Sequence, residues 1–371
     1  MAILNPMRLL PPPTRTLAGA IDGHDNGFNL VRLVCALLVV VFHGWQLNLA
    51  SPGAHDPLTR LLAPHTDLGG LAVGVFFLVS GIFITQSWVR DPHLLRFAVR
   101  RVARIVPGLF ACLLLTTLVA VAFFSDQGWH GLFERATWRY VFGNTFLHGL
   151  RYIIPPQELS LPGVLGGQPL NGPLWTLYWE GRMYVMVALL GLAAVLPLRT
   201  WLRGAAIFLL LAANLFPEVA AGYLWEARMW SLFLCGMLLY TLAPDLRIGA
   251  RHVACAAAFV AMNATRWSDL NHHPLTWFGI ALLACTAALA AGAGGVRTAP
   301  LRHLQRHDYS YGIYIYHWPV LLLLRAVLPP LGPLATTALG MAATVALAVL
   351  SWHWVEAPAQ RVARAWLRRG M

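Results

Sequence analysis

The chain has 371 residues, of which 58% are apolar and only 11% are charged. Soluble globular proteins carry roughly 25% charged residues, so this composition excludes an ordinary water-soluble globule and indicates that much of the surface contacts lipid. The formal net charge of +12 could suggest a nucleic-acid-binding protein, and the positions of the charges along the chain decide against it.

The amino-terminal residues 1–28 include three consecutive prolines, at 11–13, and no apolar stretch of signal-peptide length before a cleavage site. We therefore expect a short cytoplasmic tail there. Ten apolar segments follow, several of which approach the ~20 residues that cross a ~30 Å hydrocarbon core. They are 29–49, 71–89, 105–124, 173–196, 204–217, 223–242, 252–266, 275–293, 309–327 and 334–354. The sequence predicts an all-α polytopic membrane protein with about ten transmembrane helices, built as a single membrane domain over residues 1–371.

The loops between these segments alternate in arginine content, and all 27 basic residues are arginine. Eighteen arginines fall in the loops and tails of one side and five on the other. The arginine-rich side is cytoplasmic by the positive-inside rule, which places both termini, including the tail 355–371, in the cytoplasm. The basic charge thus reflects membrane topology, and we expect no nucleic-acid partner. The five arginines on the opposite, extracytoplasmic side are Arg60, Arg135, Arg139, Arg151 and Arg266.

The only long connection, 125–172, falls on the extracytoplasmic side and is rich in aromatic residues, glycine and proline. Long loops are often functional, and aromatic rings suit sugar faces, although an interfacial aromatic belt would explain them equally well. The five cysteines all lie in apolar segments without paired spacing. We therefore expect neither disulfides nor a metal site.

Arg32 and His43 are the most informative pair of ionisable residues in the apolar segments. Their separation of eleven residues returns to within about 20° of the same helix face and spans roughly 16 Å along the axis. Such residues are costly in lipid and are candidates for function. Each alone has a structural explanation, a snorkelling arginine or a packed histidine. A shared face would instead connect a substrate at the cytoplasmic surface to a buried functional site.

The next segments supply a small-residue pair and an arginine cluster. Ser80 and Gly81 lie mid-segment, where close helix packing is the simpler explanation and a role for Ser80 in substrate binding is the alternative. Arg100, Arg101 and Arg104 follow at the cytoplasmic start of the third segment, with spacings of three and four that place Arg104 beside both partners. Guanidinium groups suit bidentate phosphate binding, so this cluster is a candidate site for the phosphates of a substrate.

The later segments contain further polar groups. Glu180 lies within the fourth apolar segment and could orient His43, accept a proton itself or form a structural ion pair. In the ninth, Tyr311, Tyr314 and His317 form a hydroxyl-rich setting that could bind sugar. His353 and Glu356 close the last segment, and we interpret that pair as a structural anchor.

These segments together resemble the acyltransferase-3 family of multi-pass membrane acyltransferases over nearly the whole chain. The resemblance rests on the Arg32-to-His43 spacing, FFLVSG at 76–81, Arg101 and Arg104 followed by Ile105 and Pro107, PLWTLYWE at 173–180, YSYGIYIYH at 309–317, and Glu356 with Pro358.

The resemblance implies transfer of an acyl group, with acetyl expected, from cytoplasmic acyl-CoA to an extracytoplasmic carbohydrate such as O-antigen or exopolysaccharide. It implies a bacterial inner-membrane protein, no tightly bound cofactor, and polysaccharide-biosynthesis proteins as possible partners alongside lipid. The family's essential arginine and histidine carry over to Arg32 and His43, and its RxxR motif to Arg101 and Arg104. His43 would act as a general base or as an acyl carrier.

Two other functions fit a polytopic chain with intramembrane charge. The first is a transporter or flippase of a lipid-linked glycan, which the absence of an obvious two-half repeat disfavours. The second is a non-catalytic scaffold for a polysaccharide synthase, which gives no reason for a shared face of Arg32 and His43.

Overall fold

A computed structural model describes residues 15–23, 26–47, 56–62, 66–147, 159–196, 198, 200–215, 224–264, 274–294, 298–328 and 331–369. Across these ranges the chain is helical, with two isolated β-bridges in place of a sheet. Within the same ranges, four helices are long and apolar enough to cross a membrane, the last of them a continuous helical stretch over Pro333–Arg369. The predicted all-α membrane fold is confirmed at this level. Most of the tail 1–28 and residues 148–158 of the long loop lie outside the described residues.

Each of the ten apolar segments overlaps a helix within the described residues. The helices are α2 (Phe28–Gln46), α4 (Leu68–Arg90), α5 (Leu94–Phe124), α7 (Leu174–Leu192), α8 (Thr200–Leu215), α10 (Leu224–Leu242), α11 (Ala250–Ala264), α12 (Pro274–Ala293), α14 (Ser310–Val327) and α15 (Pro333–Ser351). The chain forms two compact units, the first from Met1–Leu38, Pro57–Arg90 and Ala193–Asp308, and the second from Val39–Asp56, Asp91–Leu192 and Tyr309–Met371. The boundary between them falls within α2.

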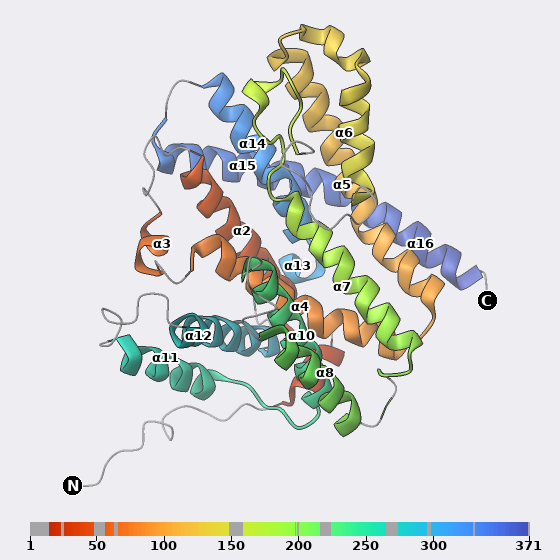
Figure 1. Ribbon diagram of the computed structural model, residues 1–371, viewed down its shortest axis with the longest axis vertical. Helices are drawn as coiled ribbons and strands as arrows, with labels where there is room; N and C mark the ends of the chain where they lie inside the picture. The colour runs from red at the N-terminus through yellow and green to blue at the C-terminus, as the bar shows by residue number, and fades with distance from the viewer. Residues whose placement is uncertain are drawn as a thin grey trace. The chain divides into compact units, whose positions relative to one another are not determined.

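In the first unit, α10 packs along α4 on one side and α8 on the other, and α11 packs along α12 (Figure 1). The contact of α4 with α10 is close because both helices have glycine there. A Cβ atom on Gly81 would lie 2.1 Å from the carbonyl oxygen of Phe233, and one on Gly236 would lie 2.1 Å from that of Leu78. Small residues thus bring two helix backbones together, as the sequence indicated for Gly81.

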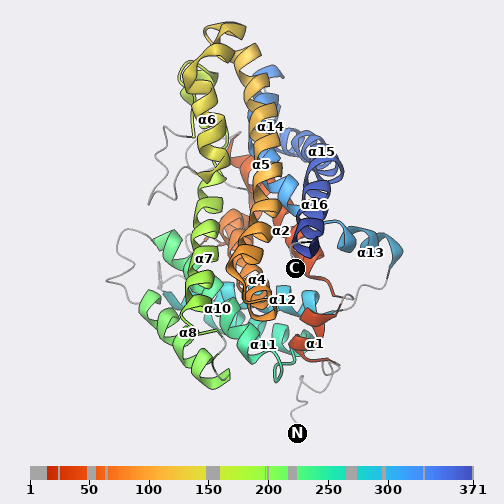
Figure 2. The ribbon, with the colours of Figure 1, turned by 90° about the vertical axis from the view of Figure 1, so that its right-hand side faces the viewer.

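In the second unit, the long helix α5 contacts α6 (Arg135–Thr145), α7, α14 and α16 (Ala357–Arg369) (Figure 2). Helix α14 packs along α15 where Gly312 lies against the backbone of Ala348. The carboxyl-terminal part of α2 belongs to this unit, and Gly44 brings it against Thr337 of α15.

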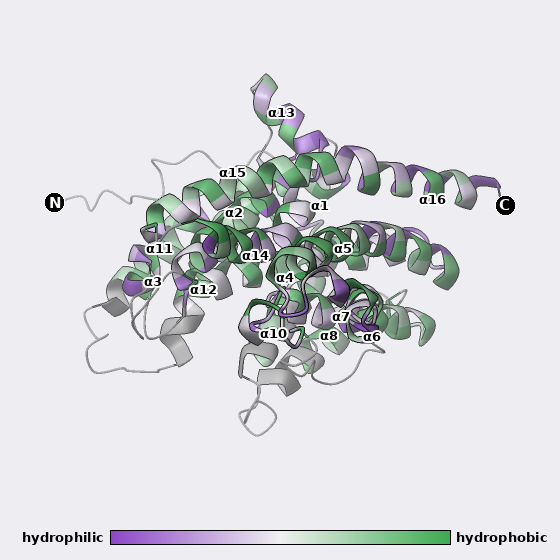
Figure 3. Ribbon diagram, turned by 90° about the horizontal axis from the view of Figure 1, so that it is seen from above, coloured by the Kyte–Doolittle hydropathy of each residue, from purple (hydrophilic) through white to green (hydrophobic). Residues whose placement is uncertain are grey.

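Helical structure also occurs outside the apolar segments. Helix α5 begins at Leu94, where the His93 side chain caps it by accepting a hydrogen bond from the Arg96 amide. The arginine cluster is therefore helical, although it precedes the apolar segment 105–124. A π-helical turn, η6 (Trp352–Glu356), joins α15 to α16, and α6 occupies part of the long loop. Figure 3 shows the contrast between the mostly hydrophobic α15 and the hydrophilic residues of α16 and of α13 (Ala299–Arg306).

Candidate active site

Helix α14 contains a proline, Pro319, that changes the hydrogen bonding of the preceding turn. Pro319 has no backbone N–H, so the carbonyl of Ile315, four residues earlier, lacks its helical donor. The Asn171 amide donates to that oxygen at 2.9 Å, and the thiol of Cys112 approaches it at 3.2 Å. Two other parts of the second unit are thereby fixed to the middle of α14.

His43 and His317 form a direct pair in this region. The Nδ1 atom of His43 lies 2.8 Å from Nε2 of His317, and Nδ1 of His317 lies 2.6 Å from the carbonyl oxygen of Tyr314. The two rings are nearly parallel, with an interplanar angle of 17°. The sequence singled out both histidines separately, and the structure brings them into one hydrogen-bonded chain.

The two histidines differ in exposure. His317 is fully buried, at 0% exposed, whereas His43 is partly exposed and has aromatic neighbours. The Trp318 ring lies edge-on to the His43 ring with centroids 5.0 Å apart, and the Trp318 Nε1–H donates to the carbonyl of Pro169 at 2.8 Å. Of the pair, His43 is therefore the histidine that a substrate could reach.

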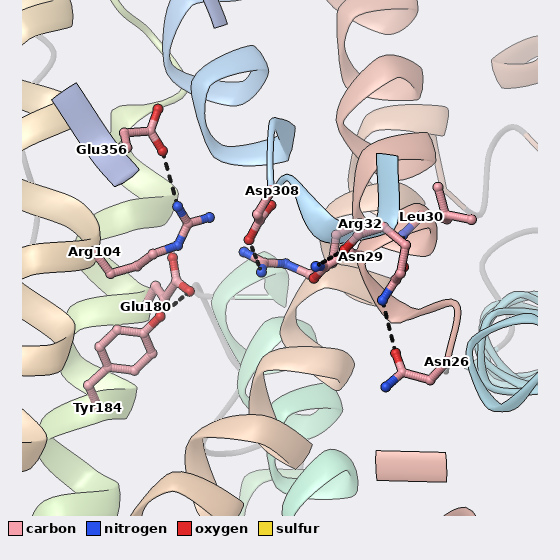
Figure 4. Close-up of polar contacts among 10 residues, drawn as sticks. Asn26, Asn29, Leu30, Arg32, Arg104, Glu180, Tyr184, Asp308 and Glu356 are labelled. Atoms are coloured by element: carbon pink, nitrogen blue, oxygen red, sulfur yellow. Dashed lines mark hydrogen bonds and ion pairs between the residues drawn. The ribbon is translucent and has the colours of Figure 1, made fainter. Parts of the chain in front are cut away.

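A second cluster surrounds Arg104 on α5. Its NH1 group lies 3.0 Å from Oε2 of Glu356, which is 1% exposed and also accepts a hydrogen bond from Ser351 at 2.9 Å (Figure 4). The guanidinium carbon lies 5.0 Å from the centroid of the Tyr311 ring. Gly108, one turn later on α5, leaves the space that the Glu356 and Tyr311 side chains fill. Arg104 thus has an acidic partner within the protein, and a donor phosphate would compete with Glu356 for its guanidinium group.

Arg101 lies between aromatic rings of the same unit. Its guanidinium carbon is 5.7 Å from the Phe97 ring centroid and 5.8 Å from that of Tyr184. Tyr184 in turn donates its hydroxyl hydrogen to Oε1 of Glu180 (Figure 4). The sequence offered Glu180 as a partner that could orient His43. In the structure, Glu180 accepts from Tyr184, and the His43 ring has a hydrogen bond with His317.

Arg100 belongs to an ion-pair group at the start of α5. Its NH1 group lies 2.6 Å from Oδ2 of Asp91, and Arg96 binds both oxygens of the same carboxylate. The hydrogen bonds from Arg96, with the charge of Arg100, lower the pKa of the Asp91 carboxyl to about 2. Asp91 therefore remains a carboxylate at every physiological pH and offsets part of the cluster's charge.

Arg32 belongs to the first unit and has an acidic partner that the sequence reading did not single out. Its NH1 group lies 2.6 Å from Oδ2 of Asp308, and the two side chains are 25% and 12% exposed (Figure 4). Asp308 is one of only 15 acidic residues and stands directly before α14, a position that could have marked it. Asn29 of α2 also donates to the carbonyl of Gln305, so α2 and the residues before Asp308 are fixed together.

The candidate sugar-binding tyrosines are buried and bonded to the backbone. Tyr311 donates to the carbonyl of Ile105 at 2.7 Å, and Tyr314 donates to that of Pro173 and also contacts Thr176. An acceptor sugar would have to displace these bonds. Ser80 lies on α4 in the first unit and is partly exposed.

Comparison with known proteins assigns the chain to a family. A family model, described as an acyltransferase domain, matches residues 25–353. The chain belongs to the acyltransferase-3 family. The matched range contains both histidines, Arg32 and the arginines of α5, and the resemblance inferred from the motifs is confirmed.

Several curated proteins are similar to this acyltransferase-3 member. Nodulation protein 10 of Rhizobium leguminosarum bv. viciae is 29% identical, covering 92% of this chain and 95% of that protein. An O-acetyl transferase of Shigella phage Sf6 is 26% identical, covering 90% and 95%. The peptidoglycan O-acetyltransferase OatA of Listeria monocytogenes is 23% identical over 79% of this chain and 51% of its own length. No solved structure matches the chain.

Proposed function

We propose that this acyltransferase is an O-acetyltransferase that moves an acetyl group from cytoplasmic acetyl-CoA to a hydroxyl group of an extracytoplasmic glycan. The proposal rests chiefly on the partly exposed His43, which His317 orients within the matched family domain. The phage and Listeria relatives, whose names specify O-acetyl transfer, support the choice of acetyl and of a hydroxyl acceptor.

The reaction needs a base for the acceptor hydroxyl and an exit for the thiolate. In the direct route, a ring nitrogen of His43 removes the hydroxyl proton while the oxygen forms a bond to the thioester carbonyl carbon. The carbon–sulfur bond then breaks, and the departing thiolate takes the proton from the imidazolium to give free CoA. In the covalent route, a ring nitrogen of His43 attacks the thioester carbonyl carbon and the carbon–sulfur bond breaks, releasing the CoA thiolate. The sugar oxygen then attacks the acyl-imidazole, the bond to the ring nitrogen breaks, and the hydroxyl proton passes to the thiolate. Arg32, eleven residues earlier on α2, stays the proposed second catalytic residue, with Glu180 as a further candidate.

The arginines at the start of α5 are the proposed donor site. The Arg101 guanidinium lies near the rings of Phe97 and Tyr184, and Arg100 and Arg104 form ion pairs with Asp91 and Glu356. The adenine nucleotide phosphates would bind there, and the pantetheine arm would carry the thioester toward His43.

The proposed topology follows from the arginine distribution: about ten spans, both termini in the cytoplasm and the loop 125–172 outside the inner membrane. The ten helices that overlap the apolar segments support it. Polysaccharide-biosynthesis proteins are the proposed partners, since they would supply the acceptor. Acyltransferase family membership disfavours the transporter alternative.

Mass spectrometry of glycan extracts tests this proposal and identifies the acceptor. A deletion strain complemented with the wild-type chain should carry one more acetyl group on a defined sugar than the same strain complemented with His43→Ala. The exposed residue His303 offers the control, because His303→Ala should restore acetylation fully. Undiminished acetylation with His43→Ala, at equal protein level in the membrane, would remove His43 from the reaction.

A further inference from the structure

The hydrogen-bonded chain from Tyr314 through His317 to His43 fixes where the hydrogens lie. A carbonyl oxygen can only accept a hydrogen bond, so Nδ1 of His317, 2.6 Å from the Tyr314 oxygen, must carry a hydrogen. A doubly protonated His317 would place a cation at a 0% exposed position within the apolar segment, which is costly. His317 is therefore neutral, and its Nε2 atom is an acceptor.

The same reasoning extends to His43. Its Nδ1 atom lies 2.8 Å from that Nε2 acceptor, so the hydrogen between the two rings belongs to His43. A neutral imidazole has only one ring hydrogen, which leaves Nε2 of His43 with a free lone pair. Without His317, His43 could adopt either tautomer.

We infer that His317 is a positioning residue that holds His43 in its Nδ1–H tautomer and directs the Nε2 lone pair to the acceptor hydroxyl. This inference rests on the proposed function. It changes the role expected for His317 from the sequence, since a fully buried ring bonded at both nitrogens acts through His43 rather than on the sugar.

His317 also stabilises the charge that forms during transfer. When Nε2 of His43 takes the hydroxyl proton, the resulting imidazolium keeps its Nδ1–H bond to His317. Hydrogen bonds to a charged group are stronger than those to a neutral one, so this bond strengthens as the charge develops. The proton returns from Nε2 to the thiolate, and neither histidine changes its net protonation over the cycle.

Two substitutions at position 317 separate this role from simple packing. The amide group of asparagine lies at the level of the histidine Nδ1 atom, so His317→Asn can keep the bond to Tyr314 but loses the bond to His43. The amide of glutamine lies at the level of Nε2, so the oxygen of His317→Gln can still accept from His43. We expect kcat to fall roughly 100-fold in His317→Asn, the lower end of what a positioned base contributes, and to stay within about tenfold of wild type in His317→Gln. The KM for acetyl-CoA should not change in either variant.

The assay uses the full-length protein purified in detergent, with matching substitutions at the exposed His303 as controls for histidine loss. Equal kcat values for His317→Asn and His317→Gln, whether high or low, would overturn the inference. A nitrogen-15 NMR spectrum of histidine-labelled protein provides a second test that does not depend on activity. It should show Nε2 of His43 unprotonated, and an Nε2–H signal for His43 would also overturn the inference. A failure of the proposed function would look different: His43→Ala would then keep its activity, whatever the two variants at position 317 do.

Discussion

At the scale of single residues, we expect the ion pair of Arg104 with Glu356 to stabilise the fold, in addition to the part of Arg104 in the proposed donor site. Glu356 is 1% exposed, so removal of Arg104 takes a cationic partner away from a buried carboxylate. Breaking a buried pair in this way typically costs about 3–5 kcal/mol, while removing both charges costs much less.

A double-mutant cycle measures this effect. Arg104→Gln and Glu356→Gln should each lower the thermal unfolding midpoint in detergent, and the double variant should lose less than the sum of the two. The exposed pair of Arg90 with Asp22, at 55% and 61% exposure, is the matched control and should show coupling of roughly 0–1 kcal/mol. Additive losses at Arg104 and Glu356 would show that the pair does not couple in solution.

The candidate residues were only partly predictable from the sequence. The helical period predicts that Arg32 and His43 share one face of a single helix. The structure has both residues on α2. The contact of His43 with His317 joins residues 274 positions apart, and no local pattern encodes such a separation. Asp308 was missed for the same reason, since its partner Arg32 is 276 positions away.

At the scale of helices, glycine determines how closely α4 and α10 approach. Alanine at position 81 would favour the helix intrinsically by up to about 1 kcal/mol. Its Cβ atom would nevertheless meet the backbone carbonyl of Phe233 at 2.1 Å, which no rotamer change relieves. Overpacking of this kind costs about 1–3 kcal/mol.

Gly81→Ala should therefore lower the unfolding midpoint measured by differential scanning fluorimetry in detergent. Gly332→Ala is the matched control, because a Cβ at position 332 meets nothing within 4 Å and the backbone there has φ of −62°. The control should leave the midpoint unchanged or raise it slightly. A midpoint for Gly81→Ala as high as that of Gly332→Ala would mean that the helices can separate without cost.

Hydropathy predicted the apolar helices well because a helix in contact with lipid must be built mostly from apolar residues. It missed the amino-terminal extension of α5 over Leu94–Arg104 and the helix α16, which are rich in arginine. Helix formation there depends on capping and spacing rather than on apolar content. The His93 cap and the ion pairs of Asp91 with Arg96 and Arg100 supply the local stabilisation.

At the scale of the whole molecule, composition and arginine distribution predict a membrane protein with an oriented donor side. The all-helical fold and the family match confirm a membrane acyltransferase. We propose that the donor binds on the cytoplasmic side and that the glycan is acetylated on the other side.

Reconstituted vesicles test that claim most directly. The full-length protein would be inserted into liposomes that enclose the surface glycan extracted from the deletion strain, and radiolabelled acetyl-CoA would be added outside. We predict label on the enclosed glycan with the wild-type protein and none with His43→Ala. Label that appears only when acetyl-CoA and glycan share one compartment, or that persists with His43→Ala, would contradict this account.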